Sequence, residues 1–170
     1  MAAQRGKIIL WTGPKHSGKS TAAGELVARA RRLGFVVAGL LAERRMHNGK
    51  FAYEGVDLGT GNRTVLAEAG TGNRGEPAFV LTAQGLAFGR TVLNGAASAD
   101  LVIVDEFGPL EMDGGGWRGE VDRLLNKSSA KIVLVVRKEI ADQIPRLYGR
   151  RCCVVEAASP TAIEEVLQSV

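Results

Sequence analysis

The residues with the clearest chemical potential lie in one glycine-rich stretch near the start of the chain. The run Gly13-Pro14-Lys15-His16-Ser17-Gly18-Lys19-Ser20 fits the phosphate-binding pattern G-x-x-x-x-G-K-[ST] at every position. A run of β-forming residues, 7–12, precedes it, and a segment with helical period, 20–33, follows it. Because strand, glycine loop and helix form the context that this pattern requires, the sequence predicts a loop that binds nucleotide phosphates.

The residue types within this loop suggest individual roles. Glycines let the backbone turn its N–H groups inward around a phosphate, and the following helix adds the positive end of its dipole. Lys19 is placed to reach the β- and γ-phosphates, and Ser20 to hold Mg²⁺. The residues expected to contact the nucleotide are Gly13, Pro14, Lys15, His16, Ser17, Gly18, Lys19, Ser20 and Thr21.

Two carboxylates follow an apolar run later in the chain. Residues 101–104 are typical of a buried parallel strand, and Asp105 and Glu106 come directly after them. Since ligands of parallel sheets bind beyond the carboxyl ends of the strands, Asp105 is predicted to hold Mg²⁺ opposite Ser20. Glu106 is predicted to orient an attacking water or to accept its proton. Taken alone, Asp105 is also consistent with a strand-end cap and Glu106 with a surface carboxylate, and the upstream loop favours the catalytic interpretation.

Transition-state charge on a γ-phosphate usually requires a cation in addition to the loop lysine. Arg137 follows the apolar strand predicted at 131–136 and is the best placed residue for this catalytic role. Any single arginine is more simply explained as a solvated side chain. The other arginines considered are Arg44, Arg45, Arg150 and Arg151.

Strand and helix patterns alternate along the chain and predict an α/β fold with a mostly parallel sheet, in a single domain over residues 1–170. Asn48-Gly49 predicts a two-residue hairpin turn within an antiparallel insertion over about 42–68. The expected strands are 35–41, 101–104, 131–136 and 152–155. The expected helices are 20–33, 83–97, 117–126, 139–144 (ended by Pro145) and a last one from Pro160, capped by Ser159.

Composition limits the classes of function. The chain has 170 residues, 45% of them hydrophobic, and a formal net charge of +4 without a block of like charges, so no strong nucleic-acid signal is present. The adjacent Cys152 and Cys153 do not form a disulfide framework. No signal peptide and no apolar run of membrane-spanning length are found, so the cytoplasm is the expected location. No protein partner is indicated.

The residues that follow Asp105 and Glu106 form a longer motif. Residues 105–111, Asp-Glu-Phe-Gly-Pro-Leu-Glu, resemble the D-E-[IF]-G-x-[ML]-E signature of the small P-loop nucleoside-triphosphatases first described in thermophiles. The resemblance extends from Lys7 to about Arg137 and implies a three-layer, RecA-like fold in which the strand before Asp105 is not adjacent to the strand before the loop. It also implies Mg²⁺-dependent hydrolysis of several nucleoside triphosphates, ATP and GTP among them, to diphosphate and phosphate.

The resemblance leaves some positions undetermined. Glu111, the last residue of the signature, either steers water as a catalytic group or holds the loop at 108–116. The family often carries a Phe-Glu pair in its middle region, and none is found near residues 79–88. Base preference is therefore not indicated by the sequence.

Two other classes of function fit the same motifs. A small-molecule or nucleotide kinase often has an acceptor-binding carboxylate after its second strand, where Glu43 stands. A nucleotide-dependent switch or adaptor would use the glycine-rich segments 70–75 and 108–116, the first of which is expected to be a mobile loop, as its switch elements. The Asp105–Glu106 pair favours hydrolysis over both.

Overall fold

One mixed sheet runs through the molecule, parallel at one end and antiparallel at the other. The computed structural model describes residues 7–70 and 78–170. The strands pair in the order β5-β4-β3-β2-β6-β7-β1-β8. Their bounds are β1 Ile8–Gly13, β2 Val37–His47, β3 Lys50–Asp57, β4 Arg63–Gly70, β5 Ala78–Leu81, β6 Leu101–Val104, β7 Lys131–Arg137 and β8 Cys152–Glu156.

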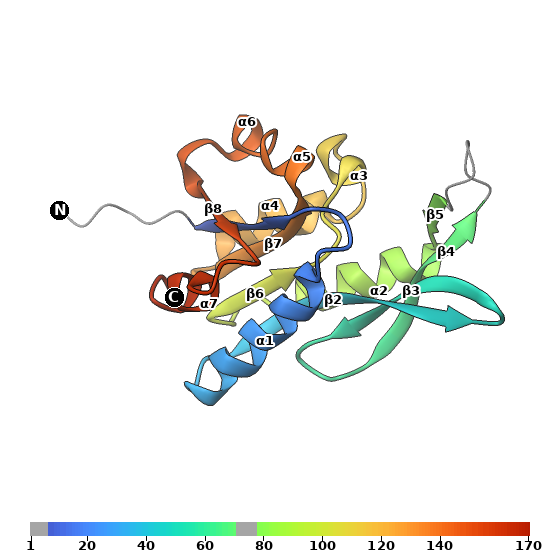
Figure 1. The fold of residues 1–170 in the computed structure, drawn as a ribbon, viewed down its shortest axis with the longest axis horizontal. Helices are drawn as coiled ribbons and strands as arrows, with labels where there is room; N and C mark the ends of the chain where they lie inside the picture. Colours follow the sequence, from blue (N-terminus) through green and yellow to red (C-terminus); the bar gives the residue numbers. More distant parts are fainter. Residues whose placement is uncertain (1–6, 71–77) are drawn as a thin grey trace.

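Helices cover both faces of this sheet and make a three-layer α/β fold, as predicted (Figure 1). One buried cluster joins α1 and α7 to the sheet, and a second cluster on the other face includes residues of α2 and α4. The bounds are α1 Lys19–Arg32, α2 Ala83–Asn94, α3 Pro109–Met112, α4 Arg118–Lys127, α5 Lys138–Ala141, α6 Pro145–Tyr148 and α7 Ala162–Leu167, with a 3₁₀ turn, η2, at Gly149–Arg151.

The parallel half of the sheet consists of β8, β1, β7, β6 and the first residues of β2. β7 pairs with β1 on one side and with β6 on the other, so the predicted separation of the two motif-bearing strands is confirmed. Residues 101–104 of β6 are all fully buried, because helices cover both faces of the strand. Continuous apolar runs in the sequence therefore mark the buried strands of the parallel half.

The antiparallel extension consists of β3, β4, β5 and residues 42–47 of β2. Asn48 and Gly49 join β2 to β3 with φ of 49° and 76°, which are the values of the predicted hairpin turn. The predicted insertion at 42–68 is thus antiparallel as expected, but pairing continues to Leu81 in β5. In Figure 1 the extension projects to the right, on the side opposite the C-terminal helix α7.

Several element boundaries differ from the predictions. Pro145 begins α6 as its first residue and does not end the preceding helix, since proline fits a first helical turn. The last regular helix begins at Ala162, because Ser159 and Pro160 form an opening turn in which Ser159 O accepts from Ala162 N (3.1 Å). α2 ends at Asn94, three residues early, and α3 was not predicted. Beyond Gly70, the predicted mobile loop lies outside the described residues.

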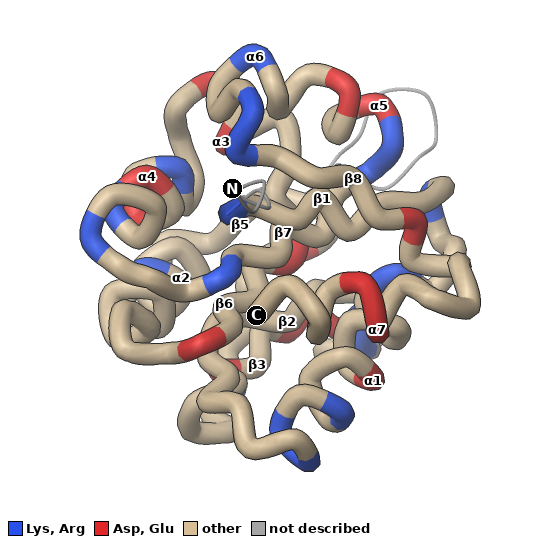
Figure 2. The backbone as a smooth tube through the Cα atoms, turned by 90° about the vertical axis from the view of Figure 1, so that its left-hand side faces the viewer, with Lys and Arg blue, Asp and Glu red and all other residues tan. Residues whose placement is uncertain are grey.

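Charge is distributed in small groups along the backbone. Figure 2 shows basic and acidic segments interspersed on one side of the molecule. Arg29, Arg31 and Arg32 occupy the last turn of α1, where cations interact favourably with the helix dipole. Within residues 7–70 and 78–170, no helix is long and apolar enough to cross a membrane.

Candidate functional site

The glycine-rich loop connects β1 to α1 in the conformation that its glycines permit. Gly18 has φ 79° and directly precedes Lys19, the first residue of α1. A Cβ at Gly13 would lie 2.9 Å from Ser17 Oγ, so a larger residue would push the loop open. His16 also has a positive φ of 59°, a conformation that non-glycine residues adopt at some cost. The backbone therefore curls tightly between strand and helix, as a phosphate-binding loop does.

Side chains beneath the loop fix its position. The indole of the fully buried Trp11 donates a hydrogen bond from Nε1 to Lys19 O (3.1 Å), which ties the first turn of α1 to the sheet. Lys19 Nζ donates to Pro14 O (2.7 Å), so its ammonium lies folded over the loop. Burial lowers the pKa of Lys19, while the carboxylates of Glu106 and Asp105 oppose that shift. These two carboxylates are thus near enough to act on the lysine.

Asp105 lies at the carboxyl end of β6 with only 1% of its surface exposed. Its Oδ2 accepts from Ala42 N (3.0 Å) and its Oδ1 from Glu106 N (2.8 Å). Burial, with a further contribution from Glu106, raises the pKa of Asp105 to about 7, and a hydrogen bond from the Ser20 side chain opposes this rise. The last contact brings Ser20 of the phosphate loop close to Asp105 of the second motif.

Glu106 is exposed and has the left-handed backbone conformation, with φ 57°. Such a conformation costs energy in a non-glycine residue, and it turns the Glu106 side chain away from the strand direction. Its carboxylate lines the same cavity as the loop. Of the positive-φ residues other than glycine that the described ranges contain, Asn48 is explained by its hairpin turn, while His16 and Glu106 both border the cavity.

Ser20 and Asp105 offer oxygen atoms suited to Mg²⁺. Magnesium prefers oxygen ligands and often uses one or two protein groups, with substrate phosphates and waters completing its octahedral shell. A hydrogen bond from the Ser20 side chain opposes the rise in the pKa of the buried Asp105, so the two oxygen-bearing groups lie close together. Groups of three or more His, Cys, Asp or Glu that could form a protein-only metal site are absent from the described part of the chain. The residues fit a magnesium ion held jointly with a phosphate.

Glu111 is 3% exposed and bonds to the backbone on both sides of its loop. Its Oε2 accepts from Gly108 N (2.9 Å) and its Oε1 from Trp117 N (3.3 Å). Burial raises the pKa of Glu111, and these backbone bonds oppose the shift. Of its two predicted roles, the contacts favour holding the 108–116 loop, which follows Glu106.

The arginines considered as a second cation fall in different places. Arg137 pairs in register with Gly13, is exposed and lines the cavity. Arg44 and Arg45 also line it, from β2. Arg150 and Arg151 belong to η2 and are not among the residues that line this cavity. Arg137 remains the arginine closest to the loop in the sheet.

Glu43 lies after the predicted second strand, within β2, but it is already paired. Its Oε2 accepts from Arg45 (2.6 Å) and from Arg63 (2.9 Å), and these bonds lower the pKa of Glu43. The carboxylate on which a kinase interpretation depended is therefore held by two guanidinium groups.

The cavity has a volume of about 1230 Å³ and lies along the carboxyl edge of the parallel strands. Residues Lys15 through Thr21 line it, whereas Gly13 and Pro14 are not among the residues that line it. Its far wall comes from the antiparallel extension and includes Tyr53 and Phe79, which sequence reasoning did not identify. Part of this wall could have been predicted from the Asn48-Gly49 turn. If the strands pair outward from that turn, Tyr53 lies opposite Arg44.

Comparisons with known proteins support one family. A family model described as NTPase matches residues 8–165. The nucleoside-triphosphatase THEP1 of Methanothermobacter thermautotrophicus is 33% identical over 139 residues, 78% of each chain. A protein of the same name from Methanosarcina acetivorans is 30% identical over 131 residues, 75% of this chain and 74% of its own. The solution structure of a human cancer-related nucleoside triphosphatase has the same fold, with a TM-score of 0.69, 17% identity, and coverage of 96% of this chain and 94% of that one.

Proposed function

Because this chain belongs to the NTPase family, we propose that it hydrolyses nucleoside triphosphates to diphosphate and phosphate with the help of Mg²⁺. The observation that carries the proposal is the contact between Ser20 of the loop and the buried Asp105, with Glu106 exposed directly beside it. Phosphate binding, metal binding and water activation then meet at one end of the cavity.

The loop binds the phosphate chain. Its backbone N–H groups and the first turn of α1 face the α- and β-phosphates, and Lys19 exchanges its bond to Pro14 O for phosphate oxygens. Mg²⁺, held by Ser20 and Asp105, would neutralise charge on the β- and γ-phosphates. Arg137, beside Gly13 in the sheet, supplies a further positive charge next to the loop.

Glu106 acts on the water that attacks. The water oxygen forms a bond to the γ-phosphorus while the bond from that phosphorus to the bridging oxygen breaks, and the diphosphate leaves. The proton of the water passes to the Glu106 carboxylate, which is exposed to the cavity. Glu111 positions Glu106 indirectly, because its bonds to Gly108 N and Trp117 N hold the following loop.

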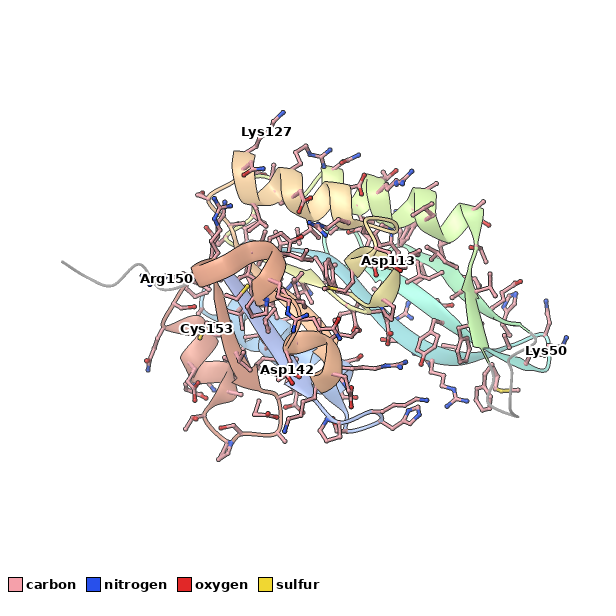
Figure 3. The ribbon with its side chains drawn as sticks, turned by 90° about the horizontal axis from the view of Figure 1, so that it is seen from above. Lys50, Asp113, Lys127, Asp142, Arg150 and Cys153 are labelled. Atoms are coloured by element: carbon pink, nitrogen blue, oxygen red, sulfur yellow. The ribbon has the colours of Figure 1, made fainter. Side chains whose placement is uncertain are left out.

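Phosphate release from the four ribonucleoside triphosphates, with Mg²⁺ or with EDTA, tests this proposal. We expect both EDTA and Lys19→Ala to lower the rate by about 100-fold or more, because each removes positive charge from the γ-phosphate. Lys127→Ala, at the far end of α4 (Figure 3), is the matched control and should stay within about twofold. Unchanged release in EDTA would contradict the metal role, and unchanged release in Lys19→Ala would contradict the loop assignment.

The same assay separates hydrolysis from phosphoryl transfer. Hydrolysis produces diphosphate and free phosphate in equal amounts. An excess of diphosphate over phosphate in the presence of an added acceptor would show that the group moves to that acceptor, and would favour a kinase.

A further inference from the structure

One wall of the cavity is built from aromatic rings and an arginine. Tyr53 and Phe79 meet edge to face, with ring centres 4.5 Å apart and planes at 72°. The Arg44 guanidinium lies 4.0 Å from the centre of the Phe51 ring and 5.9 Å from that of Phe79. Arg44, Tyr53 and Phe79 all line the cavity. Aromatic rings and a guanidinium plane offer flat faces on which a planar ligand can stack.

The charge of Arg44 is available to the cavity, unlike that of its neighbours. Arg45 and Arg63 both bind Glu43, at 2.6 Å and 2.9 Å. Among residues 7–70 and 78–170, Arg44 forms no ion pair, and its guanidinium lies over the rings of Phe51 and Phe79. Alternate residues of a strand point to opposite faces, and Arg44 shares its face with the buried Leu40 and Ala42. Its guanidinium thus faces the same side as the core beneath α2.

This wall lies on the side of Glu106 away from the phosphate loop. β6, which ends in Asp105 and Glu106, stands between β2 and the strands β7 and β1 that carry Arg137 and the loop. In an in-line reaction the leaving diphosphate points back toward the loop and the nucleophile stands opposite it. The Arg44 wall is therefore on the nucleophile side of the γ-phosphate, and the nucleoside of the hydrolysed nucleotide is on the other side.

The cavity is larger than most sites for a single small ligand. Its volume of about 1230 Å³ exceeds the roughly 300–1,000 Å³ typical of a site for a single small ligand. Burial raises the pKa of Tyr53, and Glu106 adds to that shift, so the Tyr53 hydroxyl remains a hydrogen-bond donor at neutral pH. The space beyond Glu106 thus contains aromatic surfaces, the Arg44 guanidinium and the Tyr53 hydroxyl, beside the paired Glu43 and Arg45.

We propose that Arg44, Tyr53 and Phe79 form a second ligand site, separate from the phosphate loop, for a planar aromatic molecule that carries a negative charge, such as a nucleoside monophosphate. The rings stack on the planar part, and Arg44 pairs with the anionic group. Lys19 and Arg137 add to the positive potential at the cavity. The proposal rests on the proposed function in one respect, the placement of the γ-phosphate between the loop and Glu106.

Calorimetric titration of AMP into the protein saturated with Mg²⁺ and ADP tests this site, because ADP occupies the loop. We expect one AMP to bind per chain, and Arg44→Gln and Phe79→Leu each to weaken it by about tenfold or more, the loss of one charged or stacked contact. Arg63→Gln is the matched control, because Arg63 also belongs to the extension but is paired with Glu43 and does not line the cavity, and it should stay within about twofold. Adenosine, without the charge, and ribose 5-phosphate, without the ring, should both bind more weakly than AMP.

Three results would overturn the second site: no AMP binding to the ADP-saturated protein, displacement of AMP by Mg²⁺ and ADP, or equal affinity in Arg44→Gln and wild type. Thermal unfolding of each variant checks that it is folded. Lys19→Ala separates this proposal from the proposed function, since it should lose ADP binding and keep AMP binding. If the wild-type protein releases no phosphate from nucleoside triphosphates while AMP binding depends on Arg44, the proposed function fails and the second site stands.

Discussion

The parallel half and the antiparallel extension hold their polar groups in opposite ways. In the parallel half, the buried Asp105 and Glu111 are bonded by backbone N–H groups, which leave the side chains little freedom. In the extension, Glu43, Arg45 and Arg63 are exposed or half-exposed and bond to one another. Backbone-held groups suit chemistry that needs fixed distances, whereas side-chain pairs on a hairpin suit recognition.

Replacing the general base should give the largest effect. Glu106→Gln keeps the size of the side chain but cannot accept the proton, so turnover should fall by about 10²- to 10⁴-fold while nucleotide affinity is unchanged. Single-turnover phosphate release and nucleotide titration measure the two quantities. Glu43→Gln, in the extension, is the control and should retain turnover. Near-normal hydrolysis in Glu106→Gln would show that Glu106 is not the general base, and that the parallel half does not differ from the extension in this respect.

A glycine-to-alanine substitution should lower the free energy of unfolding more in the parallel half than in the extension. Gly39 has φ 113°, and a Cβ there would overlap the backbone carbonyl of Ile103 in β6, so Gly39→Ala should cost about 3 kcal/mol or more. Gly49 in the hairpin turn has φ 76° but nothing within 4 Å of its Cβ, so Gly49→Ala should cost about 1 kcal/mol. Urea unfolding of both variants measures the difference. Equal losses would mean that the extension is packed as tightly as the parallel half.

The buried Asp105 should make the metal-free protein less stable at higher pH. An unfolded aspartate has a pKa of 3.8, whereas burial raises that of Asp105 to about 7. The folded protein then binds this proton more tightly than the unfolded chain, so the free energy of unfolding falls as the pH rises from about 4 to 7.

Asp105→Asn removes this titration and should reduce the loss of stability between pH 5 and 8 by about 2 kcal/mol. Urea unfolding in EDTA at the two pH values gives the comparison. The amide keeps one acceptor oxygen for two backbone N–H groups, so the variant also loses about 1 kcal/mol at every pH. If the free energy of unfolding had the same pH dependence in variant and wild type, ionisation of Asp105 would not be the cause of that dependence.

Breaking a side-chain pair in the extension should have the smallest effect. Arg63→Gln removes exposed bonds to Glu43 and Glu54, and the thermal midpoint should shift by less than about 2 °C. Differential scanning calorimetry at low and high salt measures it, since screening weakens such pairs further. A large shift that persists at high salt would indicate that the extension depends on these pairs as the parallel half depends on its buried bonds.

The sequence predicted the parallel half well because its signals are local. The loop pattern and the apolar run before Asp105 each span only a few residues. Because both follow strands of a parallel sheet, both are expected at the same edge of that sheet. The hairpin turn was equally local, since Asn48-Gly49 determines its own geometry. The reason for a glycine inside α2 is not local: a Cβ at Gly89 would overlap the Trp117 ring.

The remaining features depend on contacts between distant segments. Tyr53 meets Phe79 only because β4 pairs with both β3 and β5, and a register shift between Tyr53 and Glu54 intervenes. No local pattern specifies that shift. Glu111 is bonded to Trp117 because the chain returns past it, which spacing alone does not reveal. The choice between a water-steering and a loop-holding glutamate therefore needed the structure.

The position of β7 fixes the distance between the strands that carry the two motifs. β7 separates β1 from β6, so their backbones stand about 10 Å apart, two strand spacings. Neither motif can approach the other without breaking a ladder of hydrogen bonds on one side of β7. Val135 and Val136, at the end of this strand, also line the cavity. The spacing of the two motifs is therefore set by the backbone hydrogen bonds of a mainly aliphatic strand, which bears neither motif.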